Sequence, residues 1–378
     1  MQFEINTHTK PAFVKQVCKA TADGCPYFVY TLENEFLPNS DINNRFYRSV
    51  IQDAQTQTIL SVAPAKSLSN DEFEIQYANG DIQITEIVEG TMVNLFYSAA
   101  MGGWEIATRN SVGGNYHYFR TQYDGIAAPQ ITFKQMFLEA IGKTSLNDIQ
   151  GLDTSVCYSF VLQHPQNHLV LNIESPKAVL VSAYRLTQGE NGICSISHIN
   201  ITDNAFGFET PKLDETCCLK LAKCKVENPL NPYTNVGLMV THLPSGIRTT
   251  LYNPRYLEVK ALRGNNPNLH YQYLVLRKVN KVADFLRYFP QYSQHFKTFQ
   301  QHFQLYSERL HKLYIAVNVT KTLLLDNVPD KRDKYHINRL HYTVYIPMIK
   351  KHVDGAKPRV TVGKVRQYLD DENVFVPF

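Results

Sequence analysis

The chain has 378 residues, of which 44% are hydrophobic, and its formal net charge at pH 7 is +4. These values are typical of a soluble globular protein that is long enough for two domains, each with its own core. No apolar run approaches the roughly 20 residues of a membrane-spanning helix, and the first residues do not resemble a secretory signal. We therefore expect no membrane partner and an intracellular, reducing location in which the seven cysteines are free thiols.

Two β-hairpins are expected in the first third of the chain. A strand is indicated at residues 27–32, and apolar runs at 46–51 and 58–67 flank a polar turn, which indicates the first hairpin. The second hairpin pairs residues 92–98 with 104–109 around a loop that contains two glycines.

The middle of the chain alternates between expected helices and strands. Residues 132–141 have the spacing of an amphipathic helix, and Thr132 with Gln135 can form a capping box at its start. A buried strand is indicated at 178–185, and a short helix near 214–225.

The last third of the chain has a helical pattern and a strongly basic composition. Apolar residues step by three and four along one expected helix: Phe296, Phe299, Phe303, Tyr306, Leu310 and Leu313. They form either a packing stripe or an aromatic platform for bases. Residues 340–348 fit a strand or a buried helix equally well. Histidine and cysteine spacings do not suit a metal, so we expect no metal site.

The charge is unevenly distributed along the chain. Residues 255–378 contain 21 lysine and arginine residues against 10 acidic residues, a net charge of +11, whereas the remainder carries −7. A basic region of this kind is typical of proteins that bind RNA or another polyanion. Solvated helix faces with surplus lysine would give the same composition.

The most informative stretch precedes the second hairpin. Residues 86–91 read Glu-Ile-Val-Glu-Gly-Thr and include Glu89 and Gly90. This stretch resembles the nucleotidyl-transfer motif, Glu-Lys-x-Asp-Gly-Ser, of phage-type RNA ligases and of their relatives in large double-stranded DNA viruses. The motif lysine of that family attacks the α-phosphate of ATP. Ile87 occupies its position here and has no nucleophilic atom, so no lysyl-AMP can form there.

Three basic residues match phosphate-binding positions of the same family. Arg48 and Lys66 fall where an arginine precedes one strand and a lysine follows the next, and Arg109 ends the second hairpin. The resemblance implies that these residues contact a triphosphate or the phosphates of a nucleic acid. Pairing of Arg48 and Lys66 with surface carboxylates is the alternative.

The remaining stretches that resemble family motifs keep the spacing of those motifs, but other residues replace the polar or charged ones. Around Pro165 and Asn167, the ribose-contacting glutamate of the family falls on Val161 and an arginine on His168. The metal-binding glutamate before Gly237 is Val236. Two phosphate-neutralising lysines are replaced as well, by Thr250 and Tyr252.

The resemblance implies an α+β protein. A degenerate nucleotidyltransferase domain, ATP-grasp-like with two antiparallel sheets, spans 1–258, and a basic, mostly helical domain spans 259–378. The vestigial pocket would contain Arg48, Lys66, Glu89, Gly90, Arg109, His168 and Gly237. Because Ile87, Val161 and Val236 are apolar, we expect this pocket to be drier and smaller than that of a ligase.

The function implied is that of a pseudoenzyme that binds RNA or another polyanion through its basic C-terminal domain. We expect no cofactor, since the ATP and magnesium of the family would have lost their ligands. A viral origin is implied, with a location in the cytoplasm, a viral factory or the virion. A structural protein that assembles with other virion proteins is one alternative, and an active RNA ligase with a displaced lysine such as Lys66 is another.

Overall fold

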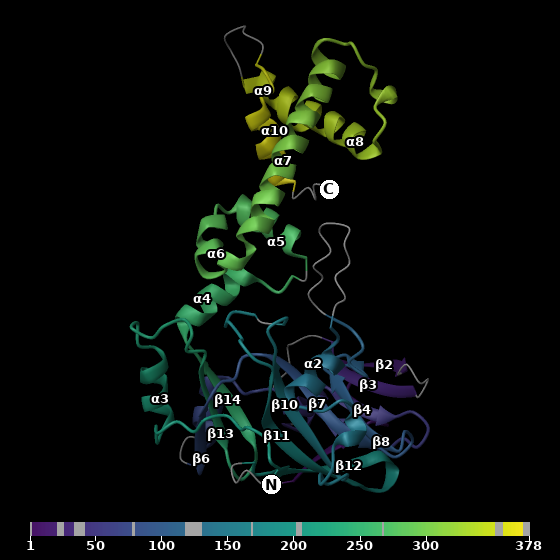
Figure 1. The fold of residues 1–378 in the computed structure, drawn as a ribbon, viewed down its shortest axis with the longest axis vertical. Helices are drawn as coiled ribbons and strands as arrows, with labels where there is room; N and C mark the ends of the chain where they lie inside the picture. Colours follow the sequence, from purple (N-terminus) through teal and green to yellow (C-terminus); the bar gives the residue numbers. More distant parts are fainter. Residues whose placement is uncertain are drawn as a thin grey trace. The chain divides into compact units, whose positions relative to one another are not determined.

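The computed structural model describes residues 2–20, 26–33, 42–77, 80–117, 131–167, 169–201, 206–266, 268–351 and 358–372. The chain forms two compact units, Met1–Lys260 and Ala261–Phe378, called unit 1 and unit 2 below (Figure 1). The predicted α+β class is confirmed, with antiparallel sheets followed by a helical region. The predicted division into domains after residue 258 stays a prediction.

The largest sheet of unit 1 has seven described strands. In spatial order they are β1 (Gln2–Asn6), β12 (Ile193–Ile199), β11 (Lys177–Gln188), β10 (Val156–Gln163), β7 (Thr91–Ser98), β8 (Gly103–Thr108) and β9 (Ser111–Val112). Side chains such as Phe160 and Leu162 share a core with Phe137 of α2 (Phe133–Ala140) on one face of the sheet. The predicted capping box of Thr132 and Gln135 starts this helix, and the pairing of β7 with β8 confirms the second hairpin.

A four-stranded sheet packs against the opposite face of the large sheet. Its strands are β2 (Val14–Ala20), β3 (Pro26–Leu32), β4 (Val50–Asp53) and β5 (Ile59–Val62). Tyr27 and Val62 from this sheet share a core with Cys157 and Tyr184 of the large sheet. The pairing of β4 with β5 confirms the first hairpin. Arg48 belongs to a 3₁₀ turn before β4, η1 (Ile42–Arg48), rather than to the strand itself.

A third sheet completes unit 1, whereas we predicted two. It consists of β14 (Ile247–Tyr252), β13 (Gly237–His242) and β6 (Ile82–Glu86), and α1 (Asn70–Tyr77) and α3 (Leu219–Val226) accompany it. The difference arises because β6 pairs with β13, while β7, only a few residues later, pairs with β10. The motif segment 87–90 therefore connects two different sheets.

Unit 2 is helical throughout the part of it that the structure describes. Helix α4 (Pro254–Arg263) crosses the division between the units, and the later helices are α5 (Leu269–Lys278), α6 (Val282–Tyr288), α7 (Ser293–Tyr314), α8 (Lys331–Arg339), α9 (Ile346–Lys351) and α10 (Val362–Asp371). The predicted stripe on α7 is a packing stripe, because Phe296, Phe299 and Phe303 are only 1–2% exposed. It is therefore no platform for bases. Residues 340–348 are helical, since a π-helical segment (Leu340–Tyr345) joins α8 to α9.

Among the described residues, no helix has both the length and the apolar character that crossing a bilayer would require.

Candidate functional site

A cavity of about 670 Å³ lies in unit 1 between the seven-stranded and the three-stranded sheets. Strands β7, β10 and β11 form one wall, strands β6, β13 and β14 form the other, and residues 66–69 close one side. Its volume is in the range of pockets that hold a ligand of nucleotide size. The cavity is thus open, although its size relative to a ligase pocket stays a prediction.

Strand alternation determines which side chains of β14 reach this cavity. Arg248, Thr250 and Tyr252 line it, whereas Ile247 and Leu251 point to the opposite face and join the core. Successive side chains of a strand point to opposite faces of the sheet, so the cavity receives every second residue. Thr250 and Tyr252, which occupy the family's lysine positions, therefore do face the cavity.

The segment between β6 and β7 brings Ile87 to the cavity wall. The backbone N–H of Ile87 donates to the carbonyl oxygen of Gly237 at 3.0 Å, which ties this segment to β13. Gly90 follows, where an added Cβ would lie 2.4 Å from the carbonyl oxygen of Leu162. Only glycine allows β10 to approach so closely. Val161 on β10 and Met92 on β7 are paired in register and line the cavity, which makes this wall apolar.

Glu89 is directed away from the cavity and has a structural role. Its side chain is buried, with 6% exposure, and Oε1 accepts hydrogen bonds from the backbone N–H groups of Val170 at 2.7 Å and Leu171 at 3.2 Å. Burial and the adjacent Glu89 carboxylate raise the pKa of Tyr256. Glu89 is not among the described residues that line the cavity. Its carboxylate stabilises the segment after β10.

Four basic side chains line the cavity: Arg48, Lys66, Arg109 and Arg248. Glu86 is the only carboxylate among its described lining residues. The cavity is therefore strongly cationic, and this concentration of positive charge attracts anions.

Arg248 is the most deeply buried of these cations. Its side chain is 9% exposed, and its Nε has no hydrogen-bond partner in the described part of the chain. Burial lowers the pKa of Arg248, Tyr184 opposes this shift, and the positive charge of Arg48 adds to it. Burial and Arg248 lower the pKa of the adjacent His198 to about 4, so this imidazole is neutral at pH 7.

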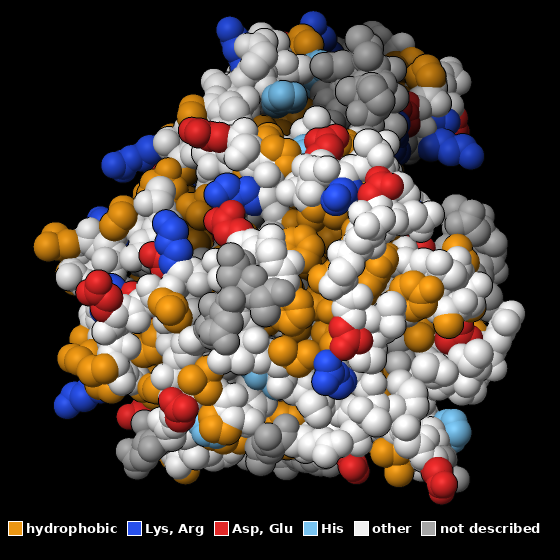
Figure 2. Space-filling view, turned by 60° about the horizontal axis from the view of Figure 1, so that its bottom comes forward, with side chains coloured by type: hydrophobic (Ala, Val, Ile, Leu, Met, Phe, Trp, Pro, Cys, Tyr) orange, Lys and Arg blue, Asp and Glu red, His pale blue; other side chains and the backbone are white. Residues whose placement is uncertain are grey.

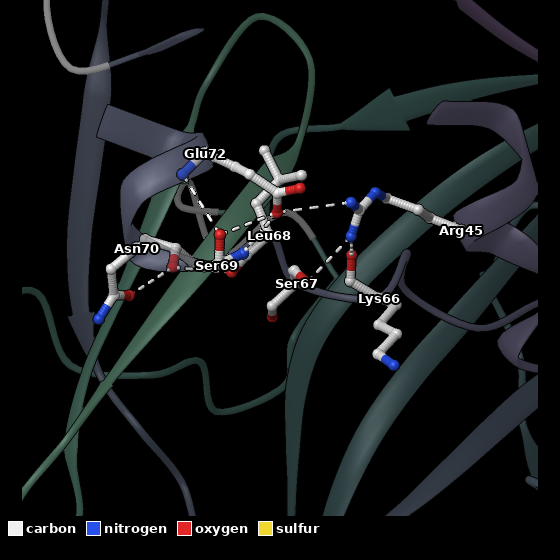
Figure 3. A network of polar contacts seen from close by, with 8 residues as sticks. Arg45, Lys66, Ser67, Leu68, Ser69, Asn70 and Glu72 are labelled. Atoms are coloured by element: carbon white, nitrogen blue, oxygen red, sulfur yellow. Dashed lines mark hydrogen bonds and ion pairs between the residues drawn. The ribbon is translucent and has the colours of Figure 1, made fainter. Parts of the chain in front are cut away.

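Lys66 is held in place through its backbone. Its N–H donates to the carbonyl oxygen of Arg45 at 3.1 Å, and the Arg45 guanidinium donates to the carbonyl oxygens of Lys66 and Ser67 (Figure 3). Arg45 also forms an ion pair of 3.7 Å with Glu72. The ammonium end of Lys66 points away from this network. Lys66 is the only lysine among the described lining residues.

A β-bulge shapes the wall opposite β14. The register between β10 and β11 shifts between Ser159 and Phe160, so that Val181 has no partner residue on β10. As a result, both Val181 and Ser182 line the cavity, although they are adjacent in the strand. Bulges commonly redirect side chains next to functional sites.

The cavity contains most of the predicted site residues. Arg48, Lys66, Gly90 and Arg109 line it, as do Ile87, Val161, Thr250 and Tyr252. Val236 and Gly237 are buried and are not among its described lining residues. Gly237 has a φ of +139°, and an added Cβ would lie 2.1 Å from the carbonyl oxygen of Leu251, so the backbone requires glycine there. His168 lies outside the described residues.

Sequence reasoning missed Arg248 and His198. The signal for Arg248 was available, because it precedes Thr250 by two residues and must share its face of the strand. Nothing in the sequence indicated His198, which reaches the cavity only through the pairing of β12 with β11.

The residues present fit a phosphate group better than a divalent metal. Four cations and the hydroxyl groups of Thr250 and Ser182 can bind phosphate oxygens. Magnesium prefers several oxygen ligands with carboxylates among them, and Glu86 is the only described carboxylate in the lining. Across the described residues, no group of three or more histidine, cysteine or acidic side chains could hold a metal ion.

No protein-family model matches the sequence, and no curated protein does. Solved structures of RNA ligases show similarity. An archaeal ATP-dependent RNA ligase has 10% identity and a TM-score of 0.42, over 89% of this chain and 74% of that one. An apo mutant of a Naegleria gruberi RNA ligase has 10% identity and a TM-score of 0.35, over 52% of this chain and 57% of that one. The Naegleria gruberi RNA ligase with PPi has 10% identity and a TM-score of 0.31, over 66% and 98%.

Proposed function

We propose that this protein is a degenerate relative of RNA ligases that binds phosphate groups of RNA in the cavity of unit 1 without transferring a nucleotide. One observation carries the proposal: four cations and Ile87 line the same cavity. The resemblance of residues 86–91 to the nucleotidyl-transfer motif supports it. The basic composition of residues 255–378 supports a further, non-specific attraction to RNA.

The physical argument separates binding from chemistry. In nucleotidyl transfer, a lysine amine forms an N–P bond with the α-phosphorus of ATP, and pyrophosphate leaves with the electron pair of the broken P–O bond. Ile87 offers only C–H bonds to the cavity, so this step has no nucleophile at the motif position. The cations remain, and electrostatic attraction of phosphate does not depend on a nucleophile.

The experiment compares covalent labelling with binding. In the first assay, the wild-type chain and the Ile87→Lys variant are incubated with magnesium and with ATP labelled at the α-phosphate, and the proteins are then denatured. In the second assay, the binding of a short 5′-phosphorylated RNA to the folded proteins is measured by fluorescence anisotropy at several salt concentrations. We expect no covalent label on the wild type and RNA affinity that falls as salt rises. A wild-type label that survives denaturation, or RNA binding that ignores salt, would contradict the proposal.

A second candidate function, an active nucleotidyltransferase, is favoured by the position of Lys66. Its side chain lines the cavity that contains the motif segment. If the wild type does become labelled, Lys66→Met should abolish the label, whereas the matched variant of an exposed lysine, Lys143→Met, should keep it. Under our proposal neither protein is labelled.

A further inference from the structure

Within the cavity, the buried side chain of Arg248 is the group that most requires a ligand. Arg248 is only 9% exposed, and its Nε has no hydrogen-bond partner in the described part of the chain. A buried donor without a partner is costly, and a buried charge more so. Such a group in a native structure calls for an explanation, and because Arg248 lines a cavity, a bound anion is the explanation that we pursue.

We propose that Arg248 is the principal phosphate-binding residue of the cavity and that Arg48, whose positive charge acts on it, assists it. Both side chains line the cavity, one from β14 and the other from the turn before β4. This inference deepens the proposed function, because it assigns the ligand-binding role in the same cavity to a residue that the motif resemblance does not include.

The backbone of Arg248 is held so that its side chain is in position before a ligand arrives. Its carbonyl oxygen accepts a hydrogen bond from the N–H of Leu68 at 2.9 Å. The next residue, Thr249, donates from Oγ1 to the carbonyl oxygen of Leu68 at 3.0 Å and to Oδ1 of Asn70 at 2.8 Å. These bonds join β14 to the segment that carries Lys66, and such pre-organisation reduces the entropy lost on binding.

Among the described residues, the groups that act most strongly on Arg248 do not neutralise its charge. Burial raises the pKa of the nearby Tyr184 above its ordinary value, so this phenol is neutral at pH 7, and so is His198. Arg48 adds a second positive charge. An anion that enters the cavity would therefore offset a repulsion that is already present, and this effect favours a doubly charged group over a singly charged one.

The chemistry of the ligand follows from these groups. A guanidinium is planar and donates two parallel hydrogen bonds to a phosphate. Two guanidinium groups, those of Arg248 and Arg48, therefore suit a terminal phosphate or a diphosphate. The same chemistry is offered by the 5′-phosphate of RNA and by the phosphates of a free nucleotide. The side chains of Ile87, Met92 and Val161 offer no hydrogen bond to a base or ribose. We expect the phosphate to contribute most of the affinity, because charge-assisted hydrogen bonds are stronger than those of neutral side chains.

The test uses the full-length chain and the Arg248→Met variant. Binding of inorganic pyrophosphate, ATP and adenosine is measured by titration calorimetry, and binding of RNA with a 5′-phosphate or a 5′-hydroxyl by anisotropy. The matched control is Arg185→Met, which removes an exposed arginine from β11 that pairs with Asp153. Thermal unfolding establishes that each variant is folded, and Arg48→Met is measured in parallel.

We expect Arg248→Met to weaken pyrophosphate binding by about tenfold or more, which is the size of a lost charge-assisted hydrogen bond. Arg48→Met should have a smaller effect, and Arg185→Met none. Adenosine should bind weakly and equally to all variants. The two RNAs and ATP distinguish a 5′-end from a nucleotide as the source of the phosphate.

Failure of this inference and failure of the proposed function give different results. If wild-type RNA binding is strong and Arg248→Met leaves RNA and pyrophosphate binding unchanged, the role of Arg248 is wrong and the proposed function survives. If pyrophosphate binds through Arg248 while RNA does not bind, the site stands and RNA is the wrong ligand. If the wild type does not bind pyrophosphate, the inference is overturned. If Arg248→Met does not fold, pyrophosphate binding is measured for Arg48→Met and Arg248→Lys instead. Unchanged binding in both of these variants would overturn the inference.

Discussion

Two regions of the chain carry clusters of basic residues, and they differ in what surrounds each positive charge. Residues 255–378 have a net charge of +11, yet many of their cations have acidic partners, among them Arg277–Asp370, Arg309–Asp333, Arg339–Glu372 and Arg366–Glu308. Residues 1–254 have a net charge of −7, yet four of their cations line one cavity with a single described carboxylate. Net charge along the sequence therefore did not indicate this cationic cavity.

The physical reason is the difference between a charge that is paired with a carboxylate and several like charges that converge on a cavity. A carboxylate partner cancels much of the field of its cation, and water and salt screen what remains at the surface. Cations that converge on a cavity with low-dielectric walls keep their field. On the face drawn in Figure 2, basic, acidic and hydrophobic side chains are intermingled, so the surface there has no region of one sign. The comparison predicts that changes in the cavity alter binding, whereas changes in the ion pairs of unit 2 alter stability.

The largest expected effect is a loss of folding stability when a glycine required by the backbone is replaced. Gly237→Ala should lower the free energy of unfolding by about 4 kcal/mol, because it combines a positive φ with a Cβ that collides with the backbone of β14. Chemical denaturation measures this loss. Gly142→Ala is the control, with a φ of +65° but open space around it, and should lose only about 1 kcal/mol. Equal losses in both variants would contradict the steric argument.

A pH effect of intermediate size compares one histidine of each unit. Burial lowers the pKa of both His198 and His270 to about 4. In the unfolded chain each histidine takes up a proton near pH 6.5, whereas in the folded chain it does so only near pH 4, so stability is full above pH 6.5 and declines as the pH falls toward 4. Each contributes at most about 3 kcal/mol to this decline.

NMR titration separates the two histidines. In Arg248→Met the pKa of His198 should rise, because a repelling charge is removed. The pKa of His270 should stay unchanged, because burial and His302 lower it and Arg248 is not among the causes of its shift. A pKa of His198 that does not respond would mean that Arg248 does not dominate the charge in this part of the cavity.

A smaller stability effect is expected in unit 2. Asp333 is 3% exposed, accepts a hydrogen bond from Tyr306 Oη at 3.1 Å and pairs with Arg309. Asp333→Asn should lower the free energy of unfolding by about 2 kcal/mol, because a charge-assisted hydrogen bond is lost, and should leave pyrophosphate binding unchanged. The exposed pair of Lys281 and Asp284 provides the control, since Asp284→Asn should cost less than about 0.5 kcal/mol. Weaker pyrophosphate binding in Asp333→Asn would contradict the expectation that changes in the ion pairs of unit 2 leave binding in the cavity unaltered.

The smallest effect concerns the exposed cations of unit 2. Lys331→Ala, at the exposed start of α8, should weaken RNA binding only about twofold and should reduce the salt dependence by at most about one ion. Anisotropy titrations at several salt concentrations measure both quantities. A loss as large as that of Arg248→Met would move the principal RNA contact to unit 2.

Local features of the fold were predictable because they depend on neighbouring residues. The capping box at Thr132 and the two hairpins follow from spacing, and the structure confirms them. Spacing also indicated the apolar stripe of α7, and the structure decides between its two interpretations in favour of packing. The third sheet was not predictable, since β6 and β7 are nearly adjacent in the sequence and pair with strands far apart in it.

Three of the retained motif residues have structural roles that do not depend on a ligand. Gly90 and Gly237 are each required by a close backbone approach, and the carboxylate of Glu89 binds backbone amides outside the cavity. These three residues would be kept in the fold whether or not a ligand binds. Gly90 nevertheless lines the cavity, and among the other residues that line it Arg248 lies outside the motif positions.

The sequence by itself determined that residue 87 has no amine, and its resemblance to a family implied the α+β class, because each depends on residue identity or on short motifs. Only the tertiary structure decided where the charges meet. Arg48, Lys66, Arg109 and Arg248 come from segments up to 200 residues apart, and three sheets must pair in register before their side chains share one cavity. Long-range pairing of this kind depends on the complete fold, so no local pattern in the chain records it.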